Sequence, residues 1–309
     1  MKLLLLAFLL ALIAWLAPHN DFGSFVGILA YWVSLVSVVV VIIKHRPTPL
    51  EKEVDANETN DGGSTSVAAL HETWSKLWHE TEIERLEVGD LCQDPWTNMH
   101  WPAVNEWVET LPPGQICEMG CGLGQWTRYY ALKGRRSVGL DIVPEAIEAA
   151  QSESDRKGLA GAEFLVGDAR RMPFDAQTFA GISSFGVVEH FMDEDLQAMI
   201  DESYRILIRG GRLLLTTPNV WCMHSVTRPL LQALGKWNLG LERSFSPRRL
   251  SRYVQRSGFR IVRYGVIESG TLFGDFLTSR IPALETLSRF IERRQSSIGF
   301  VSFVIGERV

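Results

Sequence analysis

The sequence predicts an α/β protein with a mainly parallel, doubly wound sheet, and three observations support this. From residue 70 onward, short apolar segments of strand length alternate with longer segments of helical periodicity. A glycine-rich turn follows the first of these strands. The chain has 309 residues, 46% of them hydrophobic, which is enough for a sizeable core. Its net charge of -5 favours neither a nucleic-acid coat nor a disordered tail.

Residues 1–46 are predicted to anchor the chain in a membrane. Residues 3–17 form an unbroken apolar run, and the only polar members of a second run, residues 25–43, are Ser34 and Ser37. At about 1.5 Å per residue the second run reaches roughly 28 Å as a helix, close to the thickness of a bilayer core. We therefore expect it to span the membrane.

The first run leaves two arrangements open, a two-helix hairpin or one cleaved or interfacial segment followed by one span. No small-residue cleavage site follows the first run, which favours the hairpin. Lys2 precedes the first run, the loop at residues 19–24 has no basic residue, and Lys44 and Arg46 follow the second. The positive-inside rule then predicts that the rest of the chain faces the cytoplasm.

Residues 47–69 are predicted to be a flexible acidic linker, because they are rich in acidic residues, Gly and Ser and have little to bury. Residues 70–309 form the predicted soluble domain. Its expected helices are residues 71–87, 102–110, 125–132, 144–157, 193–207 and 247–257. Its expected strands are residues 116–119, 137–140, 163–166, 179–185, 212–216, 259–267 and 300–306.

Some of these elements carry specific signals. Trp74 and Trp78 fall on one face of the first helix, which is therefore amphipathic. Ser246 and Pro247 are typical of the cap and first position of the last helix.

Two long connections, residues 218–245 and 268–299, are predicted to be insertions of the kind that determine substrate specificity. Residues 204–309 hold 17 Lys and Arg against 6 Asp and Glu, so a basic helix in the second insertion could contact a membrane or pack on the sheet.

The first predicted strand ends in EMGCGLG, in which Gly120, Gly122 and Gly124 allow a close approach between backbone N–H groups and a ligand. The dinucleotide fingerprint G-x-G-x-x-G would need a glycine at position 125, which is glutamine, so the spacing disfavours NAD. Asp141 ends the second predicted strand, where a carboxylate can accept both hydroxyls of a ribose. Asp168 ends the third, where it could accept from an adenine amino group.

The sequence resembles the class I S-adenosylmethionine-dependent methyltransferases, specifically the small-molecule group that includes ubiquinone-biosynthesis and glycan or lipid O-methyltransferases. The resemblance covers residues 96–308 and rests on EMGCGLG, VGLD, VGDARRMPF, SSFGVVEHF, GGRLLLTTPN and FSPRRLSRYVQRSGF. It implies a Rossmann-like sheet of seven strands whose last strand is antiparallel, with S-adenosyl-L-methionine as cofactor.

The resemblance also implies which residues bind that cofactor. Glu118 and the glycine turn would hold its methionine part, Asp141 its ribose, and Asp168 and Ala169 its adenine. By the same resemblance Gly120, Gly122 and Gly124 belong to this site.

His190 is the first candidate for a general base, because it follows the fourth predicted strand at the edge where such folds bind ligands. The alternative is that it only shapes the cofactor pocket. His100, which precedes the first strand, is the second candidate. The remaining histidines are too scattered to indicate a metal site.

We expect a membrane-anchored methyltransferase that O-methylates a lipidic or lipid-linked hydroxyl, such as a quinone precursor, a glycolipid or a polyprenyl-linked glycan. Anchoring raises the effective concentration of the enzyme only for an acceptor in the same layer. The alternatives are C- or N-methylation of a quinone or phospholipid and a non-catalytic scaffold that binds the cofactor in the membrane. The expected partners are the acceptor and the membrane, without nucleic acid.

Overall fold

The computed structural model describes residues 66–80, 95–222, 240–267 and 299–309, together with residues 225, 228, 229, 232 and 237. All of them lie within the unit Gly62–Val309. The predicted membrane anchor, most of the linker and most of the second insertion lie outside the described residues. No helix among the described residues is long and apolar enough to cross a membrane.

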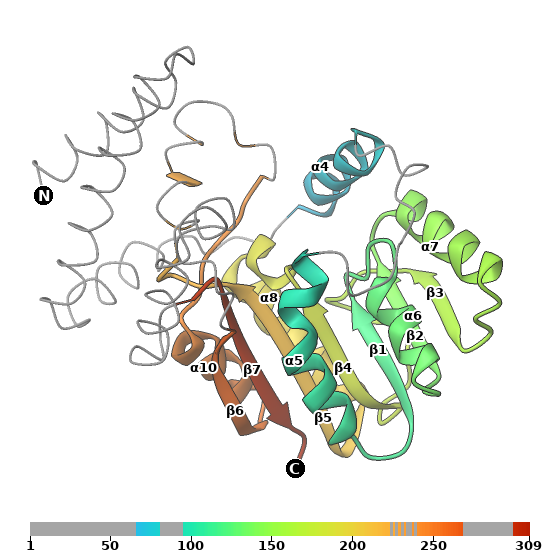
Figure 1. Ribbon diagram of the computed structural model, residues 1–309. Coiled ribbons are helices and arrows are strands. Elements are labelled where there is room, and N and C mark those ends of the chain that lie inside the picture. Colours follow the sequence, from blue (N-terminus) through green and yellow to red (C-terminus); the bar gives the residue numbers. More distant parts are fainter. Residues whose placement is uncertain are drawn as a thin grey trace, which may run out of the picture. The chain divides into compact units, whose positions relative to one another are not determined.

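Seven strands form one sheet in the order β3-β2-β1-β4-β5-β7-β6 (Figure 1). They are β1 (Gln115–Met119), β2 (Ser137–Asp141), β3 (Ala162–Val166), β4 (Phe179–Phe185), β5 (Leu207–Pro218), β6 (Arg260–Ile267) and β7 (Val301–Glu307). The first five pair in parallel, and β7 runs antiparallel to both β5 and β6. The predicted seven-stranded sheet with an antiparallel last strand is therefore confirmed.

The helices are α4 (Val67–Glu80), α5 (Pro95–Glu109), α6 (Gln125–Leu132), α7 (Pro144–Arg156), α8 (Asp193–Ile206) and α10 (Pro247–Arg256), with a short 3-10 helix, η2 (Val188–His190). Ser246 caps α10, since its hydroxyl accepts a hydrogen bond from the backbone N–H of Arg249 at 3.3 Å. This confirms the sequence signal for the start of that helix.

The starts of three elements differ from the sequence prediction. The helix α4 begins at Val67 rather than at residue 71, so residues 67–69 of the predicted linker are helical. The helix α5 begins at Pro95 rather than at residue 102. The strand β5 begins at Leu207 rather than at residue 212, directly after α8. Leu207 pairs with Phe179, and a register shift then accommodates Gly210, which has a positive φ of 75°. In the sequence, Gly210 and Gly211 are typical of a turn. In the structure, both lie inside the strand β5, at its register shift.

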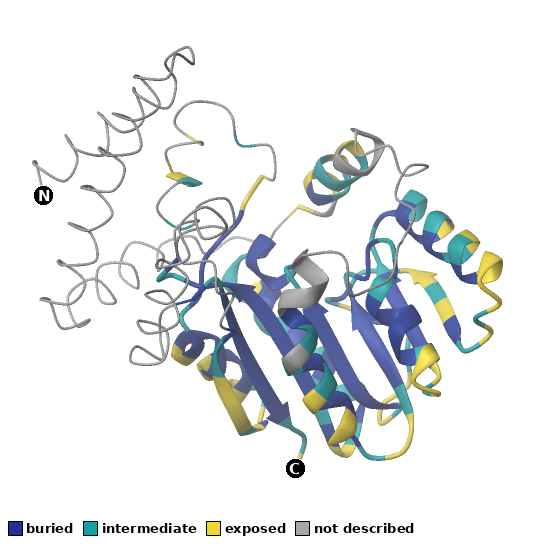
Figure 2. Cartoon of the chain, viewed as in Figure 1, coloured by how far each residue is buried: buried dark blue, intermediate teal, exposed yellow. Residues whose placement is uncertain are grey.

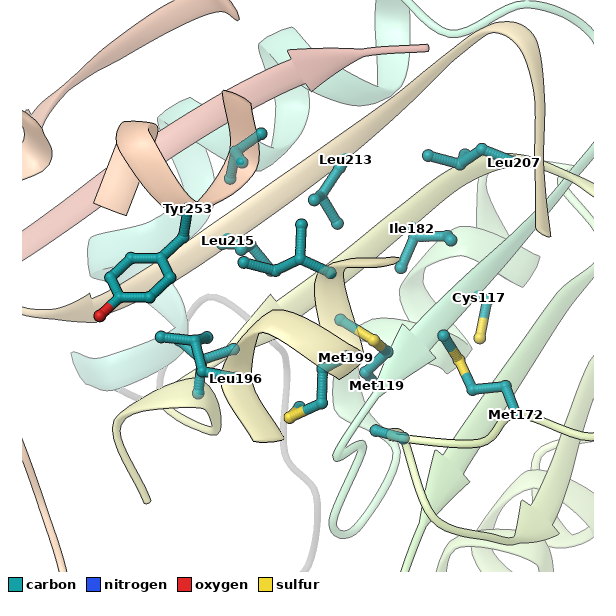
Figure 3. Close-up of a cluster of buried hydrophobic side chains, with 14 of the residues drawn as sticks. Cys117, Met119, Met172, Ile182, Leu196, Met199, Leu207, Leu213, Leu215 and Tyr253 are labelled. Carbon is teal, nitrogen blue, oxygen red and sulfur yellow. The ribbon is translucent and has the colours of Figure 1, made fainter. Parts of the chain in front are cut away.

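The sheet buries a separate cluster of apolar side chains on each face, because successive residues of a strand point to opposite sides. One cluster joins Leu213 and Leu215 of β5 to Leu196 and Met199 of α8 (Figure 3). The other joins the intervening Leu214 to aromatic residues of α5 and α6. The strands β1, β2, β4, β5 and β7 are accordingly buried over most of their length, whereas the edge strands β3 and β6 are largely exposed or half-buried (Figure 2).

Candidate functional site

A cavity of about 520 Å³ opens at the carboxyl ends of β1, β2 and β4. The order β2-β1-β4 makes the gap between β1 and β4 the point where the strand order reverses, and open α/β sheets bind ligands at such a point. The turn after β1, the end of β2, the loop after β3 and the helix η2 all contribute to its lining. Leu70 and Trp74 of α4 and Glu242 from the segment after β5 complete it.

The turn after β1 depends on its glycines. Gly120, Gly122 and Gly124 have φ values of 66°, 48° and 72°, in the left-handed region that favours glycine. A Cβ on Gly124 would lie 2.2 Å from Cε1 of Phe164, and one on Gly120 would lie 2.4 Å from Cγ2 of Val187. The backbone therefore turns more tightly here than a larger residue allows, and the turn lines the cavity with main-chain atoms.

Glu118 lies at the end of β1 and lines the cavity, although its side chain is almost fully buried. Its Oε2 accepts hydrogen bonds from the backbone N–H of Thr127 at 2.7 Å and from the Thr127 hydroxyl at 2.5 Å. Both bonds go to one oxygen, which leaves Oε1 for a ligand. Burial raises the pKa of Glu118 to about 8, even though the bonds from Thr127 act in the opposite direction.

Asp141 lies at the end of β2, and two backbone groups fix its carboxyl group. Oδ2 accepts from the N–H of Gly122 at 2.8 Å, and Oδ1 accepts from the N–H of Val143 at 3.0 Å. Burial raises its pKa, while these bonds oppose that shift. Each carboxylate oxygen can accept a second hydrogen bond, so Asp141 suits the paired hydroxyls of a ribose, as the sequence predicts.

Asp168 and Ala169 lie after β3 and also line the cavity. The Asp168 carboxylate forms an ion pair with Arg170, with 2.7 Å between Oδ2 and Nη2, and Arg170 reaches Asp195 at 3.1 Å. Arg170 belongs to the motif VGDARRMPF, but the sequence alone indicates no role for it. Arg170 holds the Asp168 side chain in place. The Asp168 carboxylate therefore already accepts hydrogen bonds from Arg170, and its remaining acceptor positions could bind the adenine of the cofactor.

His190 ends η2, lines the cavity and is only 4% exposed. Its Nδ1 lies 2.6 Å from the carbonyl oxygen of Leu241, and the Trp74 ring meets the imidazole edge to face at 4.9 Å. A carbonyl oxygen only accepts, so Nδ1 carries the hydrogen and Nε2 keeps its lone pair. Burial lowers the pKa of His190, which favours the neutral form that a general base needs.

His100 occupies a different environment. It lies on α5, is fully buried and contacts the Phe185 ring at 5.4 Å between centroids. Phe185 lines the cavity and His100 is not among its lining residues. Trp126 stacks on the same Phe185 at 5.1 Å, so this tryptophan both packs in the core and lines the cavity. Of the two predicted bases, His190 is the one at the cavity wall.

Several lining residues carry no signal in the sequence, among them Leu70 and Glu242. Trp74 was noticed only as part of an amphipathic helix. Tertiary packing brings α4 and the segment after β5 to the cavity, and local sequence patterns do not report such packing. Glu189 was recognised only within the motif SSFGVVEHF, without a role of its own.

Comparison with known proteins agrees with this site. Residues 117–215 match a family model described as a methyltransferase domain. The chain is 30% identical over 145 residues to a probable tRNA methyltransferase 9B of Bos taurus, which covers 46% of the chain and 29% of that protein. It is 36% identical over 152 residues to a 2-phytyl-1,4-naphtoquinone methyltransferase of Thermosynechococcus vestitus, covering 48% and 62%. The chain thus spans less than two thirds of either relative.

The fold also occurs among solved structures. A S-adenosylmethionine-dependent methyltransferase from Mesorhizobium loti superposes with a TM-score of 0.52 at 16% identity, covering 71% of this chain and all of that one (100%). This match concerns the fold alone. The family match lies across the cavity, from β1 through β5, and includes Glu118, Asp141 and His190. This part of the chain is a S-adenosylmethionine-dependent methyltransferase domain, and S-adenosylmethionine is its methyl donor.

Proposed function

We propose that the chain is a membrane-anchored methyltransferase that O-methylates a hydroxyl of a lipidic or lipid-linked acceptor. One observation carries this proposal: a single cavity brings His190 together with the cofactor residues Glu118 and Asp141. The remaining wall is largely apolar and aromatic, and its members include Leu70, Trp74, Phe185, Phe191 and Phe300. Such a wall suits an acceptor with an apolar body and a polar reacting group.

S-adenosylmethionine, when bound, supplies a methyl group on a positively charged sulfur. The residues of this chain position the two reactants and handle one proton. Asp141 and Glu118 orient the cofactor. The Nε2 atom of His190 accepts the proton of the acceptor hydroxyl, while the carbonyl of Leu241 holds Nδ1–H and so fixes the tautomer. Positioning supplies much of the rate, because the leaving group is already a good one.

The relatives give this proposal partial support. An acceptor of the kind named in the 2-phytyl-1,4-naphtoquinone methyltransferase would suit the aromatic wall. A tRNA acceptor is less favoured, because the chain has a net charge of -5 and the cavity wall is apolar. C-methylation of a quinone ring and N-methylation of a phospholipid amine remain the alternatives within the same chemistry. A scaffold that binds the cofactor without turnover is the alternative outside it.

The acceptor atom can be determined with purified full-length protein, methyl-labelled S-adenosylmethionine and a total lipid extract. Mass spectrometry finds any lipid that becomes heavier by one labelled CH2 unit, and nuclear magnetic resonance identifies the carbon environment. A labelled methoxy group supports the proposal. A labelled C-methyl or N-methyl group selects one of the alternatives, and conversion of no lipid contradicts the proposal.

Anchoring through residues 1–46 is a separate part of the proposal, supported by the two apolar runs. A reporter fused after residue 46 should be cytoplasmic, and one inserted within residues 19–24 should lie on the opposite side. Finding the residue-46 fusion outside the cytoplasm would contradict the anchor, because S-adenosylmethionine is made inside.

A further inference from the structure

Glu189 lines the cavity but has no role in the methyl transfer described above. It precedes His190 in η2, lines the cavity and is only 2% exposed. Its Oε2 is buried and has no hydrogen-bond partner in the part of the protein that the structure describes. A buried polar atom without a partner costs free energy, so such atoms in a native site usually await a ligand or water.

The surroundings of Glu189 are polar on one side. Glu242 lines the same cavity and is 7% exposed. Arg228 lies nearby, and its Nη1 reaches the hydroxyl of Ser244 at 3.3 Å, while its Nε is buried without a partner among the described residues. Both residues belong to the segment after β5 that the sequence marks as an insertion. The acceptor side of the cavity is thus an aromatic wall with one polar corner.

The state of Glu189 restricts what this corner can bind. Burial raises the pKa of Glu189 well above its ordinary value, and the negative charge of Glu242 acts in the same direction, while Arg228 opposes it. A neutral carboxyl group has one O–H donor and further acceptor positions. A hydroxyl group also donates and accepts, so it can satisfy this side chain, whereas an anionic group would meet two carboxyl groups.

We propose that Glu189 binds a second hydroxyl of the acceptor, adjacent to the hydroxyl that His190 serves. The argument rests on the adjacent positions of the two residues in η2 and on their shared cavity. The acceptor is then a polyhydroxy head group on an apolar body, such as a catechol or a sugar, rather than a simple phenol or alcohol. This inference rests on the proposed O-methylation and defines its substrate class. Glu189 acts here as a positioning and specificity residue.

Binding of three probes that share a hexyl tail tests the inference without turnover. Hexylphenol has one hydroxyl, hexylcatechol has two adjacent hydroxyls, and hexyl glucoside has several. Calorimetry measures their binding to purified full-length protein that is saturated with S-adenosylhomocysteine, the demethylated cofactor. At least one polyhydroxy probe should bind about tenfold or more tightly than hexylphenol, because a site built for a hydroxyl discriminates against its loss.

Two variants assign that preference to Glu189. Glu189→Ala should reduce the preference to less than about threefold, with S-adenosylhomocysteine binding unchanged, while Glu189→Gln should keep part of it, because an amide also donates and accepts. Glu194→Gln is the matched control, since Glu194 is an exposed acidic residue on α8 outside the cavity lining. This control should keep the full preference.

The inference is wrong if neither polyhydroxy probe binds more tightly than hexylphenol, or if Glu189→Ala keeps the preference. Such a result leaves O-methylation intact whenever a lipid still acquires a labelled methoxy group. Conversely, a diol preference without methylation of any lipid hydroxyl would contradict the proposed function and leave this binding role standing. The two failures are therefore distinguishable.

Discussion

The two carboxyl groups at the ends of β1 and β2 differ in how the protein holds them. Asp141 takes its orientation from backbone N–H groups of the glycine turn and of the start of α7. Glu118 takes its orientation from Thr127 of α6 and is more deeply buried. Asp141 is thus suited to neutral hydroxyls, whereas ionised Glu118 requires a positive partner. The ammonium group of the methionine part of the cofactor would provide one.

Replacement of Asp141 tests the ribose contact. Asp141→Ala should weaken S-adenosylmethionine binding by about 1.5 to 3 kcal/mol for each charged hydrogen bond lost, with the fold retained. Calorimetry measures the affinity, and circular dichroism checks the fold. Asp155→Ala, at an exposed position on α7, is the control and should bind normally. Unchanged affinity in folded Asp141→Ala, or tighter binding of NAD than of S-adenosylmethionine, would contradict the assignment.

The raised pKa of Glu118 predicts a pH-dependent cofactor affinity. Below about pH 8 the free protein carries a largely protonated Glu118, which must lose its proton to meet the cofactor's ammonium group. Affinity should therefore rise with pH between about pH 6 and pH 8, by up to about tenfold per unit. Calorimetry in buffers of different ionisation enthalpy should detect proton release. The dependence should vanish in Glu118→Gln; a flat profile for the unaltered protein would contradict this role.

His190 should be replaceable without loss of cofactor binding. His190→Ala should lower kcat by roughly 10² to 10⁴, and the loss should shrink as the pH rises and the acceptor ionises by itself. Because burial lowers the pKa of His190, kcat of the unaltered protein, measured at saturating S-adenosylmethionine, should fall only when the pH drops below about 6.5, the ordinary histidine value. A purely structural histidine would instead weaken cofactor binding at every pH, and normal kcat would leave His100 as the next residue to test.

At the scale of secondary-structure elements, the glycine turn between β1 and α6 is the tightest constraint on the site. Gly124 and Gly134 have nearly equal φ values, 72° and 75°, so alanine is strained by about 1 kcal/mol at either position. Their surroundings differ, since a Cβ on Gly124 meets Phe164, whereas one on Gly134 has nothing within 4 Å. Alanine variants at Gly124 and Gly134 therefore separate the cost of backbone strain, which both share, from the cost of steric crowding, which only Gly124 has.

Gly134→Ala should cost about 1 kcal/mol of stability and leave cofactor affinity unchanged. Gly124→Ala should cost about 1 to 3 kcal/mol more and weaken cofactor binding, because the displaced turn carries the Gly122 N–H that orients Asp141. Denaturant unfolding and calorimetry measure the two effects. Equal behaviour of the two variants would mean that the turn tolerates a larger residue.

Most elements could be predicted from the sequence because each has its own local signal. The period of the apolar residues identifies the strands, and Ser246 with Pro247 identifies the start of α10. The place of Asp141 was predictable because parallel strands end at a common edge, whereas Glu118 was predicted only through the family resemblance. The early start of β5 was not, because its register shift depends on pairing with Phe179. Contacts of Trp74 and Glu242 with the cavity depend on packing between segments far apart in the chain.

At the scale of the whole molecule, the folded domain and residues 1–46 have separate proposed roles. The sheet and its helices hold the cofactor in a cavity with an aromatic wall, and the two apolar runs of residues 1–46 would confine that cavity to a membrane surface. Confinement raises the effective concentration only toward an acceptor in the same layer. The central claim is therefore that the methyl group enters a lipid phase.

Partition of the transferred methyl group tests that claim most directly. Membranes that contain the full-length protein are incubated with methyl-labelled S-adenosylmethionine and then extracted with organic solvent. The account predicts that label enters the organic phase in proportion to the unaltered protein, and that membranes with Asp141→Ala at equal abundance transfer far less. Label that stays in the aqueous, protein or RNA fractions, or that enters lipid equally with Asp141→Ala, would contradict the account.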